Sequence, residues 1–347
     1  MAKKTETKKV VPVVPAVQGH ASIVAKNASG EVAKVVSELK ENMSGLYYPD
    51  VDPTYIITEQ VERIFNILME SVKEAPQNVS LVGPHGCGKT EMGIQFAARH
   101  NLPCLIMNCA NLREPRDWFG YRTAINGSVF WIESLFDKAV TKGGVVIIFD
   151  ELNRAAPNIL NTLMPLLDAR RKTYLEEKGA DLAVGPNTFF FATLNEGIGY
   201  SGTNNLDFAI RDRFSRIIEV DFLPAEDETK LLVARTKIDT KTAKALVDIA
   251  NNVRKKARGI NSTFTQSVST RQLLAAAADF RHGGVETLMF TLANHFTPDG
   301  GTQSERYQII QLIQGKFGEV KGSIATTVST ATMKEEEIVE ALLGRSK

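Results

Sequence analysis

The sequence has few cysteines and no long apolar run. Its three cysteines, Cys87, Cys104 and Cys109, show no C-x-x-C spacing, and a disulfide at Cys87 would disrupt the glycine-rich loop that contains it. Cysteine used this sparingly is typical of a reducing compartment. No apolar run reaches the length of a signal peptide or of a membrane span. We therefore expect a cytoplasmic protein that has no membrane partner.

Excess charge of either sign is also missing. The 41 Lys and Arg residues against 40 Asp and Glu leave a formal net charge of +1, which gives no general reason to expect a nucleic-acid partner. The net charge does not exclude a local basic patch on the surface. The spacing of His20, His100, His282 and His295 does not match a metal site. The chain of 347 residues is 43% apolar and 23% charged, which is typical of a soluble protein with two domains.

The most informative stretch is the octapeptide GPHGCGKT at residues 83–90. It stands between the apolar run 79–82 and the helical pattern 91–99, which is the setting in which this pattern forms a phosphate-binding loop. Its glycines let backbone N–H groups converge on an anion at the positive end of the helix. Lys89 is expected to reach the outer phosphates of ATP and Thr90 to hold Mg²⁺. A glycine turn with an incidental Lys-Thr pair is the simpler alternative.

Apolar runs and helical patterns alternate around this loop. The runs 104–107, 145–149, 188–192 and 217–220 are separated by helical segments, which predicts an α/β fold with a parallel sheet covered by helices on both faces. The nucleotide is expected at the carboxyl edge of that sheet. After residue 224 the pattern is helical throughout, over 226–237, 242–258, 270–281 and 285–296.

Composition and periodicity divide the chain into four expected parts. The first is a disordered basic arm, whose lysines are either simply solvated or contact nucleic acid or an acidic protein. The α/β nucleotide-binding domain follows, preceded by helices over 31–42 and 59–72, and then a small helical lid domain and a weakly specified tail with a helix over 333–343. The expected bounds are 1–30, 31–223, 224–318 and 319–347.

Polar residues stand at the ends of two predicted strands. Asp150 and Glu151 end the second run after the loop; Asp150 is expected to help hold Mg²⁺ and Glu151 to deprotonate the attacking water. Asn195 follows the third run and is expected to hydrogen-bond that water or the γ-phosphate. The alternatives are a solvated acidic turn for the pair and an ordinary turn residue for Asn195.

Two arginines are candidates for contact with the nucleotide. Arg213 ends a short helical stretch far from the loop in sequence, and an arginine acting in trans can add ~10³–10⁵ in rate. A salt bridge with Asp207 or Asp212 is the alternative, and it competes more strongly for Arg211. Arg271 opens a helix of the second domain, where it could close over the nucleotide of its own chain.

These motifs, in this order, resemble an AAA+ ATPase of the MoxR branch, and within it the CobS-type ATPase subunit of cobaltochelatase. The stretch 48–53 resembles the entry motif of that family, 200–214 the stretch before its arginine finger, and 269–318 its lid. The resemblance covers residues 47–318. The residues that carry it are Gly83–Thr90, Asp150-Glu151, Asn195, Arg213-Phe214 and Ser269-Thr270-Arg271.

The resemblance implies a homo-oligomeric ring, commonly a hexamer, with ATP between neighbours. Arg213 is then the finger that enters the next subunit, Arg271 the sensor of the lid, and Asn108 the residue that couples pore contacts to Glu151. A hairpin is implied over 119–130, where Asn126-Gly127 is also a turn signal on its own. A second is expected over 172–184. Both would face the pore or a partner, unless they are ordinary surface loops.

We therefore expect a Mg²⁺-dependent ATPase whose ring remodels a partner protein, which in this branch often carries a von Willebrand A-type domain. Three alternatives stay open: the ATPase subunit of a cobalt-inserting chelatase, a nucleic-acid translocase, which the near-neutral charge disfavours, and a scaffold that does not hydrolyse ATP. The expected catalytic residues are Glu151, Lys89, Asn195 and Arg213, and the expected metal ligands Thr90 and Asp150. The expected nucleotide-binding residues are Gly83, Pro84, His85, Gly86, Cys87, Gly88, Lys89, Thr90, Glu91 and Arg271.

Overall fold

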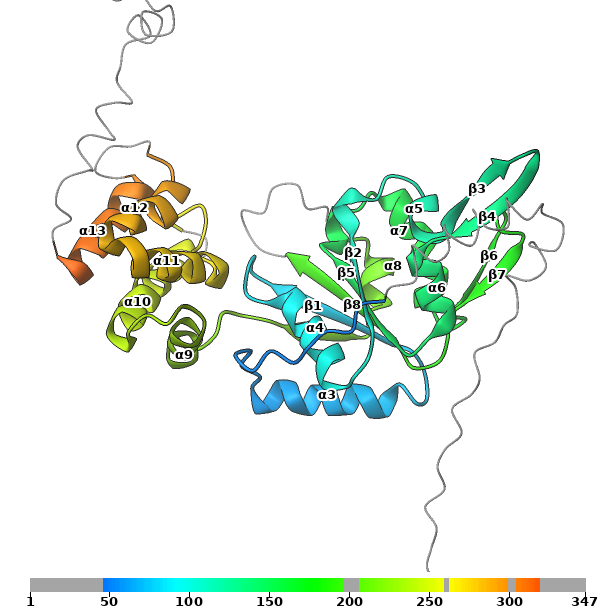
Figure 1. Cartoon of the computed structure of the whole chain (residues 1–347), viewed down its shortest axis with the longest axis horizontal. Helices are drawn as coiled ribbons and strands as arrows, with labels where there is room; N and C mark the ends of the chain where they lie inside the picture. The colour runs from blue at the N-terminus through cyan, green and yellow to red at the C-terminus, as the bar shows by residue number, and fades with distance from the viewer. Residues whose placement is uncertain (1–45, 196–205, 259–261, 299–303, 319–347) are drawn as a thin grey trace, which may run out of the picture.

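The computed structural model describes residues 46–195, 206–258, 262–298 and 304–318 (Figure 1). Four expected parts lie wholly or partly outside the described residues: the basic arm, the helix over 31–42, the first six residues of the stretch 200–214, and the tail after residue 318. No helix in the described part of the chain is long and apolar enough to cross a membrane.

A parallel sheet of five strands forms the centre of the α/β part. Its strand order is β2-β5-β8-β1-β9, so the strand that leads into the glycine loop lies between the third apolar run and the last one. Every pairing is parallel, as predicted. The strands are β1 (Gln77–Gly83), β2 (Cys104–Asn108), β5 (Val145–Asp150), β8 (Thr188–Asn195) and β9 (Arg216–Glu219).

Both faces of the sheet are buried. Successive residues of each strand point to opposite sides, so neighbouring residues pack in different clusters. Ile147 and Phe149 pack in one cluster with α6 (Leu135–Lys142) and α7 (Pro157–Leu167). Val146 and Ile148 pack in the other with α3 (Glu59–Ser71) and α4 (Lys89–Arg99). This two-sided burial explains why the strands read as continuous apolar runs rather than as alternating patterns.

Two antiparallel hairpins project from the side of the core opposite to the lid (Figure 1). The first joins β3 (Gly120–Ile125) to β4 (Ser128–Glu133), and it turns at Asn126 and Gly127, which both have positive φ as a tight hairpin turn requires. The second joins β6 (Lys172–Leu175) to β7 (Ala180–Ala183). Both hairpins were predicted. The short helix α5 (Arg116–Phe119) precedes the first of them.

The helical part has its own buried cluster. It is built from α9 (Ala225–Thr236), α10 (Thr240–Ala257), α11 (Thr270–Gly283), α12 (Thr287–Thr291) and α13 (Glu305–Phe317). The segment 285–296, predicted as one helix, instead contains α12 between two 3₁₀ turns. The first of these turns begins at Gly284, which has a φ of +65°. The last helix, α13, was not predicted, because it buries only a narrow strip that includes Ile309 and Ile313.

Candidate active site

The glycine loop links β1 to α4, at the carboxyl edge of the sheet. A Cβ on Gly83 would lie 1.9 Å from the carbonyl oxygen of Val220, so only glycine fits there. Gly86 and Gly88 have positive φ values of 71° and 99°. Gly88 is the N-cap of α4 and that N-cap makes no side-chain hydrogen bond, which leaves the first N–H groups of α4 available to an anion.

Lys89 lies inside this loop and is 6% exposed. Its Nζ donates to the carbonyl oxygens of Gly83, at 3.0 Å, and Pro84, at 2.6 Å. Burial lowers the pKa of Lys89, although neighbouring acidic groups oppose this. The ammonium group is therefore held by two backbone acceptors, which phosphate oxygens can replace.

Thr90 and Asp150 meet at the start of α4. The Thr90 hydroxyl donates to Asp150 Oδ1 at 2.6 Å, and the hydroxyl of Thr193 donates to the same oxygen at 2.8 Å. Thr193 Oγ1 also accepts the backbone N–H of Glu151 at 2.8 Å. Thr193 was not predicted as a site residue; it lies here because Phe149 pairs with Ala192, which puts the next residues of β5 and β8 side by side.

The carboxylate of Glu151 contacts one hydrogen-bond donor and one ion-pair partner among the described residues. Asn195 Nδ2 donates to Oε1 at 3.2 Å, and Arg154 Nε lies 3.1 Å from Oε2. Glu151 has a φ of +54°, so the strand ends in a left-handed residue there. Asn195 is held in turn by its carbonyl, which accepts Asn153 Nδ2 at 3.0 Å. Arg154 and Asn153 were not predicted.

Asn108 was expected to couple to Glu151. It ends β2 beside Asp150 in register, and its Oδ1 accepts the N–H of Ala110 at 3.1 Å, which caps the following turn. The amide that reaches Glu151 in this structure belongs to Asn195.

The N-terminus of α11 lies against the glycine loop. A Cβ on Gly86 would lie 2.7 Å from the Cβ of Ser269, the N-cap of α11. Burial lowers the pKa of His85, and the positive charges of Arg271 and Lys89 lower it further. A Cβ on Gly86 would also lie 3.8 Å from the Cβ of Arg271, so the start of the Arg271 side chain lies close to the loop of its own chain.

Arg213 lies near the amino ends of the strands, at the opposite edge of the sheet from the glycine loop. It is the C-cap of α8 (Phe208–Asp212), and its carbonyl accepts Nδ2 of Asn78, which stands at the start of β1 rather than at its loop end. The Nη1 of Arg213 donates to the carbonyl of Ala209 at 2.5 Å. Within the described residues Arg213 makes no ion pair, and Asp207 instead caps α8 by accepting the N–H of Ala209.

The entry segment connects α4 to the lid. Asp52 accepts the N–H and hydroxyl of Thr54, at 2.8 and 2.6 Å, and pairs with Arg235 of α9. Burial raises the pKa of Asp52, but the Thr54 hydrogen bonds and the charge of Arg235 outweigh it, so the pKa is lowered overall. Gln95 of α4 donates to Glu91 Oε1 at 3.0 Å and accepts the N–H of Asp52 at 2.9 Å, so Glu91 faces this segment.

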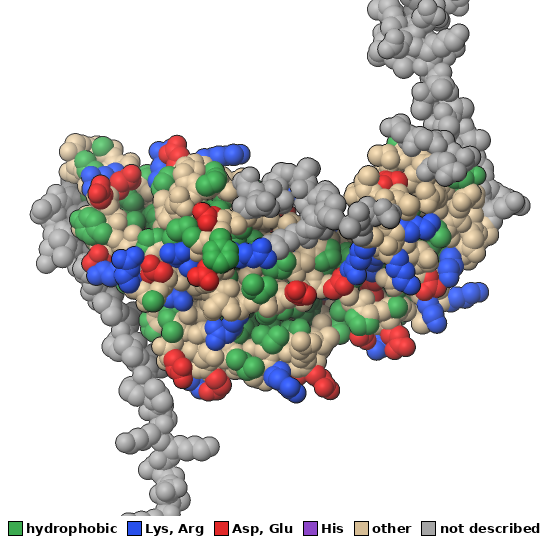
Figure 2. All heavy atoms as spheres, turned by 180° about the vertical axis from the view of Figure 1, so that it is seen from behind, with side chains coloured by type: hydrophobic (Ala, Val, Ile, Leu, Met, Phe, Trp, Pro, Cys, Tyr) green, Lys and Arg blue, Asp and Glu red, His purple; other side chains and the backbone are tan. Residues whose placement is uncertain are grey.

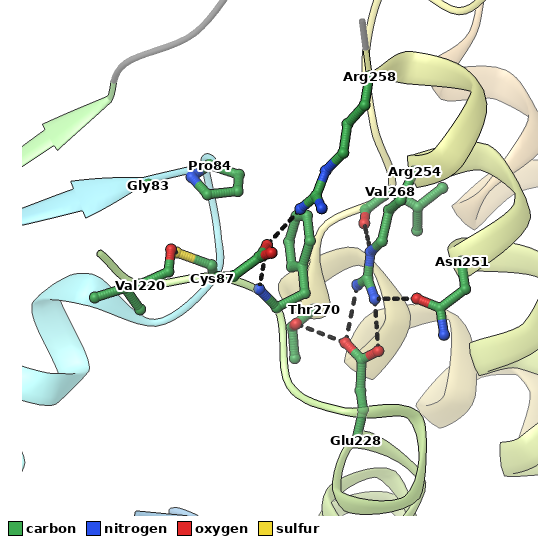
Figure 3. A network of polar contacts seen from close by, with 12 residues as sticks. Gly83, Pro84, Cys87, Val220, Glu228, Asn251, Arg254, Arg258, Val268 and Thr270 are labelled. Carbon is green, nitrogen blue, oxygen red and sulfur yellow. Dashed lines mark hydrogen bonds and ion pairs between the residues drawn. The ribbon is translucent and has the colours of Figure 1, made fainter. Parts of the chain in front are cut away.

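A buried polar network joins three lid helices, and its arginine also packs on Phe222 in the linker, residues 220–224 between β9 and α9 (Figure 3). Arg254 of α10 forms a two-pronged ion pair with Glu228 of α9, at 2.6 and 2.9 Å, and its guanidinium lies 3.8 Å from the ring centroid of Phe222. Thr270 donates to Glu228 Oε1 at 2.7 Å. The residue after Thr270 is Arg271, so this bond ties the start of α11, next to Arg271, to α9.

Cys87 connects the loop to the same linker. Its Sγ donates to the carbonyl of Val220 at 3.3 Å, and burial raises its pKa (Figure 3). The raised pKa favours the protonated thiol, which packs against the linker.

The donor set at Thr90 and Asp150 fits a magnesium ion. Hydroxyl and carboxylate oxygens are the ligands that Mg²⁺ prefers, and it takes the remainder from phosphates and water. Within the described ranges no group of three or more His, Cys, Asp and Glu side chains could hold a metal by itself. The hydroxyl of Thr90 and the carboxylate of Asp150 are two oxygen groups, which fit a cation whose other ligands are phosphates and water.

Two family models match the chain. The first is an AAA domain of the dynein-related subfamily, over residues 78–214, and the second is the CbbQ/NirQ/NorQ C-terminal model, over residues 228–304. The first match covers the sheet except for β9, and the second covers most of the helical part.

Several known proteins are similar in sequence. The putative chaperone BssE of Thauera aromatica is 32% identical over 241 residues, which are 69% of this chain and 84% of BssE. The denitrification regulatory protein NirQ of Pseudomonas aeruginosa is 27% identical over 67% of this chain and 88% of NirQ. The aerobic cobaltochelatase subunit CobS of a Sinorhizobium species is 26% identical over 82% of this chain and 88% of CobS.

Among solved structures, the RuvB Holliday junction branch migration motor of Thermotoga maritima matches with a TM-score of 0.42 and 15% identity. The match covers 80% of this chain and 87% of RuvB.

Proposed function

The chain belongs to the AAA+ ATPases of the MoxR branch, and from this premise we propose that it works as a Mg²⁺-dependent ring that remodels a partner protein. The observation that carries the proposal is the cluster at the sheet edge, where Thr90, Thr193 and Asp150 share one hydrogen-bonded oxygen beside Glu151. Each residue type there suits a step of phosphoryl transfer.

Lys89 exchanges its two carbonyl acceptors for the outer phosphates of ATP and offsets their charge. Thr90 and Asp150 would hold Mg²⁺, and the bound ion would supply positive charge that offsets the charge developing on the phosphate oxygens. Glu151 accepts the proton of the attacking water. Asn195 and Arg154 hold its carboxylate from either side, which supports this role, because a general base must be fixed within hydrogen-bonding reach of the proton it takes.

The position of Arg213 supports action between subunits. Asn78 and Gly83 are the second and last residues of the seven-residue strand β1, so at about 3.3 Å per residue Arg213 and the glycine loop are separated by roughly 16 Å. An arginine side chain of its own chain does not span that gap. This separation supports a role for Arg213 in the site of a neighbouring subunit, which would need at least two subunits per active site, as in a ring such as a hexamer.

Replacing the finger tests this proposal. We expect Arg213→Ala to lower the ATP turnover number by ~10³-fold or more while nucleotide binding stays close to wild type, because the finger acts on the transition state in a neighbouring site. Arg211→Ala is the matched control, because Arg211 is an exposed arginine of the same helix α8, and this variant should keep most of the activity. Normal turnover by Arg213→Ala would remove Arg213 from the catalytic machinery.

The partner is proposed from the relatives. BssE is described as a putative chaperone, and remodelling of a partner protein, such as one with a von Willebrand A-type domain, is the reading we favour. The match to CobS over 82% of this chain favours a second candidate, an ATPase subunit of a cobaltochelatase. On the face drawn in Figure 2, basic and acidic side chains are intermixed over the core, which together with the net charge of +1 disfavours a nucleic-acid translocase.

Capture from a native lysate distinguishes these candidates. The Glu151→Gln variant, loaded with ATP, is expected to retain its partner, and mass spectrometry then identifies what is bound. Recovery of the other subunits of a chelatase would support the second candidate. Recovery of an unrelated protein, absent from a Lys89→Ala control that lacks the phosphate contact, would support general remodelling.

A further inference from the structure

The start of β1 holds a buried side chain that the nucleotide site does not use. Asn78 is 3% exposed, and its amide makes three hydrogen bonds to three different segments. Its Nδ2 donates to the carbonyl of Leu167 at 2.8 Å and to the carbonyl of Arg213 at 2.6 Å. Its Oδ1 accepts Nη1 of Arg171 at 2.6 Å. Asn78 therefore joins the end of α7, the root of the β6–β7 hairpin and the end of α8.

Arg171 fixes the orientation of this amide. Its guanidinium, which can only donate, contacts Oδ1 of Asn78, so the amide nitrogen must face Arg213. The same guanidinium donates to the carbonyls of Leu166, at 3.2 Å, and Pro76, at 2.9 Å. The carbonyls of Leu166 and Leu167 lie at the C-terminal end of α7, where a helix leaves acceptors unpaired and favours positive charge. Arg171 and Asn78 together satisfy them.

The contact with Asn78 is one of several that hold the end of α8. Arg213 is the C-cap of this five-residue helix, its backbone N–H donates to the carbonyl of Ile210 at 3.2 Å, and its own carbonyl accepts from Asn78. Its Nε is buried and has no hydrogen-bond partner among the described residues, so within this part of the chain the guanidinium keeps one unused donor. The Asn78 amide holds the backbone carbonyl of the residue that carries this side chain.

We propose that Asn78 is a positioning residue for Arg213, oriented by Arg171, so that the root of the β6–β7 hairpin and the arginine finger are fixed by one amide. The proposal rests on the trans role of Arg213 put forward above. It implies that a partner which displaces this hairpin changes catalysis in the neighbouring subunit, because Arg171, Asn78 and Arg213 form one hydrogen-bonded chain.

The first test is Asn78→Asp. Aspartate keeps an oxygen for Arg171 but faces the carbonyls of Leu167 and Arg213 with an acceptor, which repels them. We expect the turnover number to fall about 10- to 100-fold, as small misplacement of a reacting group does, with the KM for ATP within about twofold of wild type. Gln77→Glu is the matched control: Gln77 is a buried neighbouring amide that donates to Ser71, and its replacement should leave the turnover number unchanged.

The decisive readout is complementation between subunits. Asn78→Asp subunits keep their own glycine loop and Glu151, whereas Glu151→Gln subunits keep an intact finger. Mixing the two should therefore restore ATP turnover to well above the sum of the separate variants. Mixing Arg213→Ala with Glu151→Gln should restore it in the same way. A purely structural defect in Asn78→Asp would not be rescued by a neighbour.

The two possible failures are distinguishable. If Arg213→Ala is not rescued, Arg213 does not act in trans, and both the proposed finger and the inference built on it are wrong. If Arg213→Ala is rescued and Asn78→Asp is not, the finger stands and the positioning role of Asn78 is overturned. Should Asn78→Asp fail to fold, Arg171→Lys, which keeps the charge but not the forked donor, takes its place in the same mixture with the same expected rescue.

Discussion

The buried ion pair of the lid offers a sharp test of how the helical part is held together. Glu228 is 0% and Arg254 4% exposed, and the pair is two-pronged. Glu228→Ala leaves the Arg254 charge buried without its partner, since Asn251 and Val268 offer only neutral acceptors. Breaking a buried pair in this way costs about 3–5 kcal/mol of stability. The variant also removes the acceptor of Thr270.

The assay is urea unfolding followed by circular dichroism, with the free energy of unfolding compared among variants. Glu228→Gln should cost less than Glu228→Ala, because an amide oxygen still accepts from Arg254 and Thr270. Asp227 directly precedes Glu228 and pairs with Lys230 at the surface. Asp227→Ala should therefore change stability little. A Glu228→Ala variant as stable as Asp227→Ala would refute the reasoning, since it would mean that the Arg254 charge is solvated without Glu228.

Two further predictions concern the site and the entry segment. Thr193→Val should lower the turnover number by about 10²-fold, because Asp150 and the Glu151 N–H lose their shared partner. Thr188 is a buried threonine at the other end of β8, and Thr188→Val should lower stability without a comparable loss of turnover. Asp52 has a pKa below its ordinary value of 3.8, so its contribution to stability is present above that pH and is lost as the pH falls through the lowered pKa. Asp52→Asn should therefore weaken the fall in unfolding midpoint below about pH 4 in an acid titration; an unchanged acid profile would contradict the Asp52–Arg235 link.

The sheet and the glycine loop could be predicted because their signals are local. Continuous apolar runs such as 145–149 report burial on both faces, and the loop pattern needs only eight consecutive residues. The Asn126-Gly127 turn is similarly local, since both residues take positive φ.

The partners within the site could not be predicted, because they depend on strand register and on packing between distant segments. Thr193 reaches Asp150 only because Phe149 pairs with Ala192, and no sequence pattern fixes that register. Arg154 follows Glu151 by three residues, so the local turn brings it to the carboxylate, and this spacing is a signal that could have been used. Asn78 looks like an ordinary polar residue at the start of a strand.

The helical part was the least predictable. The segment 285–296 has apolar residues at helical spacing, yet it forms one short helix between two 3₁₀ turns. In α13 the apolar residues do not form a single wide stripe, so periodicity missed a helix that packing against the lid cluster stabilises. Glu228 and Arg254, 26 residues apart, read as solvated charges until the fold buries them together.

The most direct test of the central claim is a single-turnover measurement with the Glu151→Gln variant. The protein is loaded with radiolabelled ATP and Mg²⁺, and the bound nucleotide is analysed over time beside wild type. If Glu151 is the general base held by Asn195 and Arg154, wild type converts the ATP to ADP, whereas the variant retains it and hydrolyses it about 10²–10⁴ times more slowly. Hydrolysis by Glu151→Gln at the wild-type rate would contradict the assignment of the site.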